Sequence, residues 1–234
     1  GSRLCRHLSA LGHQVVGTTQ AADPESLPFP ATRVDLLDMP AVARAIEAAA
    51  PDAIVHLAGL SHVRSSWEQI GDYFRVNVLG TRHVLAAAGE NRVVLASSGE
   101  VYGLVPEEEQ PITESAPVDP RNPYAMSKAA AELLALDRGA VVVRSFNLIG
   151  PGQSATFALA SFARQLAAIS RGEVEPVLHV GNLDNRRDFL HVDDSLEAFR
   201  LLAAEGVAGE CYNLASGEAH SVSEIGRASC RERV

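Results

Sequence analysis

Apolar and polar positions along residues 1–150 recur with the two spacings that distinguish strands from helices. Short, continuous apolar runs predict buried strands, and longer stretches with apolar residues three or four positions apart predict amphipathic helices. The predicted strands cover residues 13–18, 52–59, 92–96 and 140–144. The predicted helices cover residues 2–11, 40–50, 67–89 and 124–136. Because the strands are apolar on both faces and alternate with helices, the pattern predicts an α/β fold with a doubly wound parallel sheet.

The pattern loosens after Gly150, where regular elements are shorter and more widely spaced. The sequence there predicts, in chain order, a helix over 157–170, a strand over 176–180, a charged turn over 182–188, a helix over 193–204 and a strand over 211–214. We therefore expect a Rossmann-like domain over residues 1–150 and a smaller, incomplete α/β domain over residues 151–224.

Both ends of the chain differ from those expected of an intact gene product. The sequence opens without a methionine and with helical spacing from the first residues, which predicts a fragment that begins inside an element. The closing segment, residues 225–234, resembles one reading frame of a common DNA-sequencing adapter. We expect this segment to be an adapter-derived tail, so the fold prediction leaves it out.

The composition narrows the classes of protein to which the chain can belong. Apolar residues make up 47% of the chain and charged residues 21%, which excludes disordered and collagen-like classes. The net charge of −9, with no polybasic run and no long apolar stretch, predicts no binding to nucleic acid or to a membrane. The 3 cysteines form no CxxC pair, so we expect no metal site and a reducing compartment, the cytoplasm.

The single lysine of the chain, Lys128, follows Tyr124 by four positions within a predicted helix. Residues at this spacing share a helix face, so we expect the ammonium to lie beside the phenol and to lower the pKa of Tyr124. A tyrosine tuned in this way exchanges a proton with a carbonyl or hydroxyl group near neutral pH. A surface helix that carries both residues by chance is the alternative on spacing alone.

A cluster of polar residues, Ser97, Ser98 and Glu100, follows the predicted strand 92–96. It belongs at the carboxyl edge of a parallel sheet, where such folds bind ligands and where a serine can polarise a substrate oxygen. With Ser98, Tyr124 and Lys128 in these places, the sequence resembles the extended short-chain dehydrogenase/reductase family of NAD-dependent epimerases and dehydratases. The resemblance implies that these three residues are catalytic and that Glu100 has the place of the base in the dehydratases.

The resemblance also implies an NAD(P)H cofactor and the residues that hold it. Gly1 corresponds to the third glycine of a dinucleotide-binding loop whose first strand and other glycines are missing. The further cofactor-binding residues that the family implies are Asp35, Leu36, Leu57, Ala58, Gly59, Asn77, Tyr124 and Lys128. The choice between NAD and NADP stays open, because Thr18, Thr19 and Gln20 include neither the acid expected for NAD nor a nearby arginine for NADP.

Parts of the sequence further resemble the members of this family that act on GDP-sugars. The matching stretches are residues 144–153, 162–165 and 180–189. The substrate-binding residues implied are Ser61, Ser98, Asn147, Arg164 and Arg187. An arginine can grip a diphosphate with two parallel hydrogen bonds, so Arg187 fits a pyrophosphate clamp with Asn147 as a second donor. A solvated charged turn is the alternative for Arg187, and Leu148 departs from the histidine expected in many relatives, which leaves the sugar open.

The implied reaction is NAD(P)H-dependent reduction of the C4 ketone of a GDP-4-keto-6-deoxy-hexose to GDP-D-rhamnose. The resemblance implies a homodimer for the complete protein, and we expect the fragment itself to be inactive. A GDP-mannose 4,6-dehydratase with Glu100 as base is the nearest rival hypothesis, although its neighbour Gly99 has no side chain to serve as the acid. A UDP-sugar 4-epimerase and a nucleotide-sensing homologue without catalysis are two further rival hypotheses.

Overall fold

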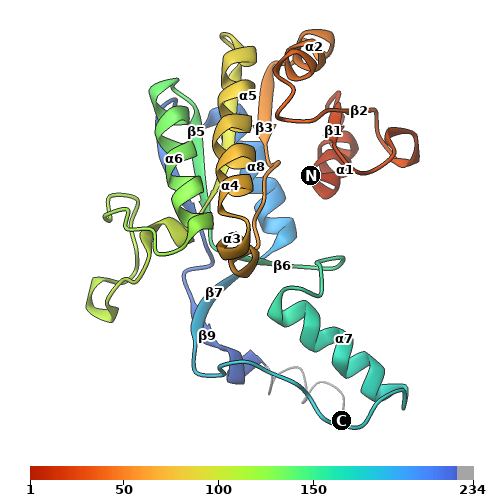
Figure 1. Ribbon diagram of the computed structural model, residues 1–234, viewed down its shortest axis with the longest axis vertical. Coiled ribbons are helices and arrows are strands. Elements are labelled where there is room, and N and C mark those ends of the chain that lie inside the picture. The colour runs from red at the N-terminus through yellow and green to blue at the C-terminus, as the bar shows by residue number, and fades with distance from the viewer. Residues whose placement is uncertain (226–234) are drawn as a thin grey trace. The chain divides into compact units, whose positions relative to one another are not determined.

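The computed structural model describes residues 1–225, and these form two units that interleave along the chain (Figure 1). The first unit comprises Gly1–Ser145 and Leu196–Leu214, and the second comprises Phe146–Ser195 and the residues from Ala215 on. The domains predicted from the sequence are consecutive instead, with a boundary at residue 150. The difference arises because residues 196–214 return to the first unit and add the last strand to its sheet. Residues 226–234 of the predicted adapter-derived tail lie outside the described part of the chain.

The strands of the first unit all pair in parallel. One sheet has the order β1-β2, with β1 over Gly17–Thr19 and β2 over Ala31–Arg33. The other has the order β3-β4-β5-β8, and its strands are β3 (Ala53–His56), β4 (Arg92–Ser98), β5 (Val141–Ser145) and β8 (Cys211–Leu214). Parallel strands that alternate with helices confirm the predicted Rossmann-like α/β class.

Apart from α1, which precedes β1, the helices of the first unit lie between strands in the sequence. They are α1 (Ser2–Ala10), α2 (Met39–Ala49), α3 (Val63–Glu68), α4 (Ile70–Tyr73), a π-helical segment (Phe74–Leu79), α5 (Gly80–Ala88) and α6 (Pro123–Asp137), and α8 (Val192–Glu205) spans both units. Short 3-10 turns occupy Pro24–Ser26, Gly99–Tyr102 and Glu107–Glu109. The helices α5 and α6 lie on one face of the four-stranded sheet (Figure 1).

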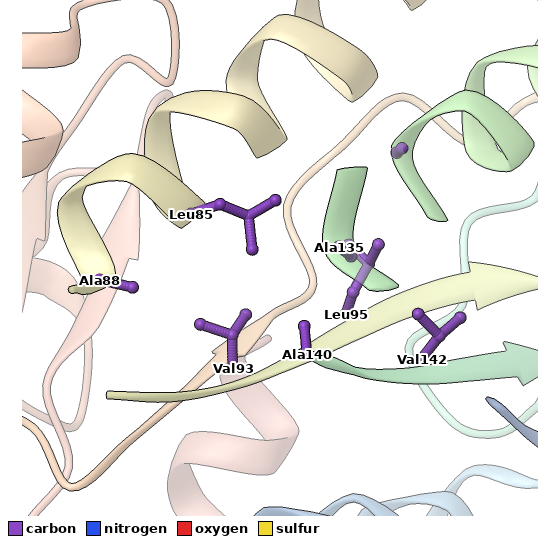
Figure 2. Close-up of a cluster of buried hydrophobic side chains, with 8 residues drawn as sticks. Leu85, Ala88, Val93, Leu95, Ala135, Ala140 and Val142 are labelled. Atoms are coloured by element: carbon purple, nitrogen blue, oxygen red, sulfur yellow. The ribbon is translucent and has the colours of Figure 1, made fainter. Parts of the chain in front are cut away.

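A compact apolar cluster holds α5 and α6 on strands β4 and β5. In Figure 2, Leu85 and Ala88 of α5 and Ala135 of α6 lie over apolar side chains of the two strands. The buried members are Leu85, Ala88, Val93, Leu95, Ala131, Ala135, Ala140 and Val142. Alanines at 131 and 135 let the backbone of α6 come close to the sheet, and close packing of this kind fixes the position of the helix. The cluster therefore sets where α6 presents its first two turns.

The single long helix predicted over residues 67–89 is wrong in detail. The structure divides this stretch into α3, α4, the π-helical segment and α5, because Gln69 leaves the helical conformation and residues 74–79 widen to π geometry. Such π segments are rare and often lie at functional sites. At the start of the chain, β1 begins only at Gly17, so most of the predicted strand 13–18 has no strand partner.

The described part of the second unit contains a small mixed sheet and a long helix. Its strands are β6 (Asn147–Ile149), β7 (Arg186–His191) and β9 (Ala219–Ser221), and its helix is α7 (Ala158–Ser170). Strand β7 pairs in parallel with β6 and antiparallel with β9. The predicted strand over 176–180 is wrong: Val177 and Val180 are exposed there, at 53% and 42% of their surface, and no strand forms. The predicted turn over 182–188 is wrong in its last part, which belongs to β7.

Candidate functional site

Ser98 is the last residue of β4, at the carboxyl edge of the parallel sheet. Its hydroxyl oxygen accepts a hydrogen bond from the Glu100 amide over 3.2 Å and so caps the 3-10 turn Gly99–Tyr102. This cap stops the strand and turns the chain sharply, which leaves the buried Ser98 side chain at the edge of the sheet rather than within it. The turn also places Glu100 directly after Ser98.

The helix α6 carries Tyr124 in its first turn and Lys128 one turn later. Asn122 begins the helix: its side-chain oxygen accepts a hydrogen bond from the Ala125 amide over 2.8 Å, and Pro123 occupies the first helical position. Tyr124 and Lys128 keep only 9% and 8% of their surface exposed. The predicted shared helix face is therefore present and buried.

The pKa of Tyr124 is raised, which is opposite to the direction predicted from the Lys128 spacing. Burial is the main cause, and the charges of Glu100 and Tyr73 act in the same direction, whereas a hydrogen bond with Ser98 opposes them. The phenol is consequently protonated over the whole neutral range. In this structure Tyr124 is suited to donate a proton and not to accept one.

Lys128 is a buried ammonium without a hydrogen bond to any residue in the described range 1–225. Burial lowers its pKa to about 8, and the negative charge of Glu132 opposes this shift. An unpaired buried charge is costly unless a ligand satisfies it. Gly59 lies close by, because a Cβ at that position would be 3.9 Å from Lys128 Nζ, and as a glycine it leaves this space beside the ammonium free of a side chain. These features fit the hydroxyl-bearing ribose of a nicotinamide cofactor.

Asn77 lies in the π-helical segment and fixes the loop after β3. Its side-chain oxygen accepts a hydrogen bond from the Leu60 amide over 2.8 Å, and its amide group donates to the Leu60 carbonyl and to Ser127 Oγ, each over 2.9 Å. A Cβ at Gly59 would come within 2.8 Å of Asn77 Oδ1, so only glycine fits there. Asn77 and Gly59, both predicted to bind cofactor, thus shape the Leu57–Gly59 strand end and join it to α6.

Tyr73 is a neighbour of Tyr124 that the sequence analysis did not assign to the site. The two rings meet edge to face with centroids 6.3 Å apart, and the Tyr73 hydroxyl donates to the His62 carbonyl over 2.6 Å. In the sequence, Tyr73 and Val76 are spaced as on one apolar face of the predicted helix 67–89, and this spacing does not indicate a role at the site. The contact restrains the Tyr124 ring, since edge-to-face pairs have a preferred geometry.

Gly1, Asp35 and Leu36, which were predicted to bind the cofactor, lie at the start of α1 and in the loop after β2. Gly1 is the N-cap of α1, and the Asp35 carboxylate accepts a hydrogen bond from the Leu37 amide over 2.9 Å. The strand register places Arg33 directly beside Thr19 at the end of β1. The sequence analysis found no arginine near this strand end because Arg33 is distant in sequence and adjacent only through β-pairing.

The predicted substrate-binding residues are divided between the two units. Ser61 lies exposed in the first unit, between β3 and α3. In the second unit, Asn147 of β6 donates to the Asp188 carbonyl of β7 over 3.1 Å, so it lies next to the strand that carries Arg187. Arg187 is exposed and donates to the Arg186 carbonyl, and Arg164 is exposed on α7. The structure thus brings Asn147 and Arg187 onto neighbouring strands.

Within residues 1–225, no three His, Cys, Asp or Glu side chains are grouped so that they could hold a metal ion. The acidic run Glu107–Glu109 forms an exposed 3-10 turn. No helix in this described range is both long enough and apolar enough to cross a membrane.

A family model described as the NAD dependent epimerase/dehydratase family matches residues 1–215. The chain belongs to this family. GDP-6-deoxy-D-mannose reductase from Pseudomonas aeruginosa is 42% identical over 185 residues, which are 75% of this chain and 61% of that protein. The dTDP-glucose 4,6-dehydratase from Streptomyces niveus is 38% identical over 175 residues, which are 71% of this chain and 50% of that protein. The chain therefore spans only about half to three fifths of these relatives.

Solved structures of the family have the same fold. RMD from Pseudomonas aeruginosa, in complex with NADPH, is 36% identical with a TM-score of 0.83, over 96% of this chain and 76% of that one. The Thermus thermophilus UDP-glucose 4-epimerase, in complex with NAD, is 32% identical with a TM-score of 0.86, over 99% of this chain and 79% of that one. The resemblance inferred from Ser98, Tyr124 and Lys128 is therefore confirmed at the level of the family.

Proposed function

We propose that the whole protein reduces the C4 ketone of a GDP-4-keto-6-deoxy-hexose, with GDP-D-rhamnose as product, using NADPH or NADH. The observation that carries this proposal is the placement of Ser98, Tyr124 and Lys128 at one edge of the sheet, with Tyr124 held protonated. The 42% identity to GDP-6-deoxy-D-mannose reductase supports the choice of a GDP-sugar.

Each of these side chains has one task in the proposed reaction. The bound nicotinamide supplies a hydride to the ketone carbon. The Ser98 hydroxyl donates a hydrogen bond to the ketone oxygen, and Tyr124 transfers its phenolic proton to that oxygen as negative charge develops on it. Lys128 holds the ribose hydroxyls and stabilises the tyrosinate that the proton transfer leaves behind.

A dehydratase is the second candidate function, because a hydrogen bond holds the Glu100 side chain, the base that a dehydratase would need, in a defined orientation. Asn122 Nδ2 donates to the Glu100 carboxylate over 3.2 Å, and a dTDP-glucose 4,6-dehydratase is among the relatives. A dehydratase also needs an acid to protonate the departing hydroxyl, and the adjacent position is Gly99, which has no side chain. This favours the reductase.

The deciding experiment incubates a completed protein, extended to the length of its relatives, with three nucleotide sugars. GDP-4-keto-6-deoxy-mannose, GDP-mannose and UDP-glucose are each supplied with the oxidised and reduced forms of NAD and NADP. We expect oxidation of NADPH or NADH only with the ketone. Formation of a 4-keto product from GDP-mannose would establish the dehydratase instead, and formation of UDP-galactose from UDP-glucose would establish the epimerase.

A further inference from the structure

Glu132 is a buried carboxylate that the proposed reaction does not use. It lies on α6 one turn after Lys128 and keeps 3% of its surface exposed. Arg144 of β5 donates to it from Nε, 3.2 Å from each carboxylate oxygen, and from its terminal nitrogen over 2.9 Å. The Ser97 hydroxyl also donates to Glu132 Oε1. The carboxylate thus joins α6 to strands β4 and β5.

Arg144 extends these links to the turn that carries Glu100. It donates to the Tyr102 hydroxyl over 2.9 Å and to the Glu114 carbonyl over 3.1 Å, and its guanidinium lies 4.9 Å from the centre of the Tyr102 ring. The Tyr102 hydroxyl in turn donates to Asn213 Oδ1 of β8 over 2.7 Å. The Glu132–Arg144 pair therefore links α6, which carries Tyr124 and Lys128, to the strand and the turn that carry Ser98 and Glu100.

Stability alone does not explain a buried ion pair of this kind, because the cost of removing two charges from water can exceed the energy of their attraction. In proteins, well-packed apolar residues of similar size often replace such a pair with no loss of stability. What apolar residues cannot supply is a directional hydrogen bond to Ser97, the neighbour of Ser98, or a negative charge one helical turn from Lys128.

We propose that Glu132 is a positioning residue that, anchored by Arg144, holds Ser98 at a fixed place relative to Tyr124 and Lys128 and places a negative charge one helical turn from Lys128. The proposal rests on the function proposed above for those three side chains. Its first effect is geometric, since the bond to Ser97 ties the end of β4 to the helix that carries Tyr124. Its second effect is electrostatic.

The electrostatic effect determines the pH at which Lys128 loses its proton. The titratable groups that interact electrostatically with Lys128 are Glu132 on its own helix and His56 on β3; His56 is neutral, since its pKa is lowered to about 3. Burial alone lowers the pKa of Lys128, and Glu132 is the charge that opposes it. Because the pKa of Tyr124 is raised, Lys128 deprotonates first on the alkaline side. Removal of the Glu132 charge should therefore move the alkaline loss of activity to lower pH.

The test compares variants of the completed protein by kcat/KM for the ketone and by NADPH affinity, measured by fluorescence, both as functions of pH. Glu132→Gln keeps the shape of the side chain and removes its charge. For this variant we expect the alkaline limbs of both pH profiles, that of kcat/KM and that of NADPH affinity, to move to lower pH by about one unit. Glu132→Asp keeps the charge but is too short to reach Ser97, so we expect lower kcat with the alkaline limbs in place. The control is Glu197→Gln, which removes one partner of the half-exposed Glu197–Arg200 pair on α8.

Glu132→Gln leaves Arg144 buried and unpaired, which can prevent folding. The double variant Glu132→Gln/Arg144→Gln removes both charges and is measured in that case; because loss of the Arg144 charge offsets part of the effect, we expect a smaller downward shift of the same alkaline limbs. Unchanged alkaline limbs in either folded variant would overturn the proposal. If the parent protein does not reduce the ketone, the proposed function fails, and the NADPH affinity profile still decides the role of Glu132, because it depends only on Lys128 and the cofactor.

Discussion

Asn122 connects the two halves of the candidate site through Glu100. Its amide nitrogen donates to the Glu100 carboxylate over 3.2 Å, while its amide oxygen caps the helix that carries Tyr124. One side chain therefore sets both the start of α6 and the orientation of the acid after Ser98. Loss of this residue should affect stability and activity together.

The first prediction concerns Asn122→Ala. We expect a loss of about 1 kcal/mol in the free energy of unfolding, as for other N-cap removals, and a lower kcat because Glu100 and Tyr124 are no longer tied. Urea denaturation and steady-state kinetics of the completed protein measure the two effects. The matched control is Asp38→Ala, which removes the N-cap of α2 at its bond to the Ala41 amide. Equal loss of kcat in both variants would contradict the role given to Asn122.

The second prediction concerns the proton donor. Tyr124→Phe removes the phenolic hydroxyl and keeps the ring that packs against Tyr73, so the site should stay folded. We expect turnover to fall by about 10²-fold or more, as when a general acid is removed, with NADPH affinity unchanged. Turnover close to that of the parent protein would show that another group delivers the proton.

The third prediction concerns acid stability and rests on His56. Its Nε2 lies 3.1 Å from Thr81 Oγ1, and burial is the main reason why its pKa is lowered from 6.5 to about 3, with the Lys128 charge contributing. In the unfolded chain His56 therefore takes up a proton below pH 6.5, whereas in the folded chain it stays neutral until about pH 3. The free energy of unfolding therefore falls as the pH decreases through this window. The cost is on the order of 4 kcal/mol by the lower end of that window.

Urea denaturation at a series of pH values tests this account of His56. We expect His56→Gln to flatten the decline in the free energy of unfolding between about pH 6.5 and about pH 4, whereas His13→Gln, at an exposed histidine, should leave it as it is. A decline of the same steepness in all three proteins would assign the acid sensitivity to other groups.

The fourth prediction concerns the form of the cofactor. Arg33 lies beside Thr19 at the end of β1, and no carboxylate directly follows that strand to repel a 2′-phosphate. We expect Arg33→Ala to weaken NADPH binding about tenfold, the effect of one charge-assisted hydrogen bond, and to leave NADH binding unchanged. Fluorescence titration measures both constants, with Arg44→Ala on the exposed side of α2 as the control. Equal weakening for both cofactors would remove Arg33 from phosphate recognition.

The helices and strands that were predicted well from the sequence are those that neighbouring residues determine, through a continuous apolar run or a helix-starting proline. The buried run Val93–Leu95, the helix after Pro123 and the strand Cys211–Leu214 each appear close to their predicted place. The break within residues 67–89 was not predictable in this way, because the π-helical segment carries Asn77, whose hydrogen bonds to Leu60 and Ser127 join residues that are distant in sequence. The sequence did not predict the short strands of the second unit for the same reason, since β9 is defined by its pairing with β7.

The charged groups show a similar division. Tyr124 and Lys128 were found because their spacing is local, but the direction of the Tyr124 pKa shift was wrong, because burial of the phenol cannot be read from spacing. The Glu132–Arg144 pair was missed. The sequence nevertheless contains an indication of this pair. Glu132 lies four residues after Lys128 on a helix rich in alanine, and Arg144 follows a run of valines. Each charged residue therefore occupies a position where an apolar residue is expected.

The burial of Lys128 has a consequence for the chemical labelling of this chain. Lys128 is the only ε-amine, so a reagent that acylates primary amines can reach only this side chain and the N-terminal amine. With a pKa of about 8, a large share of the ε-amine is uncharged and nucleophilic in mildly alkaline buffer, while burial slows access to it. Mass spectrometry after brief acylation would thus report, through a single side-chain adduct, how often the site opens to solvent.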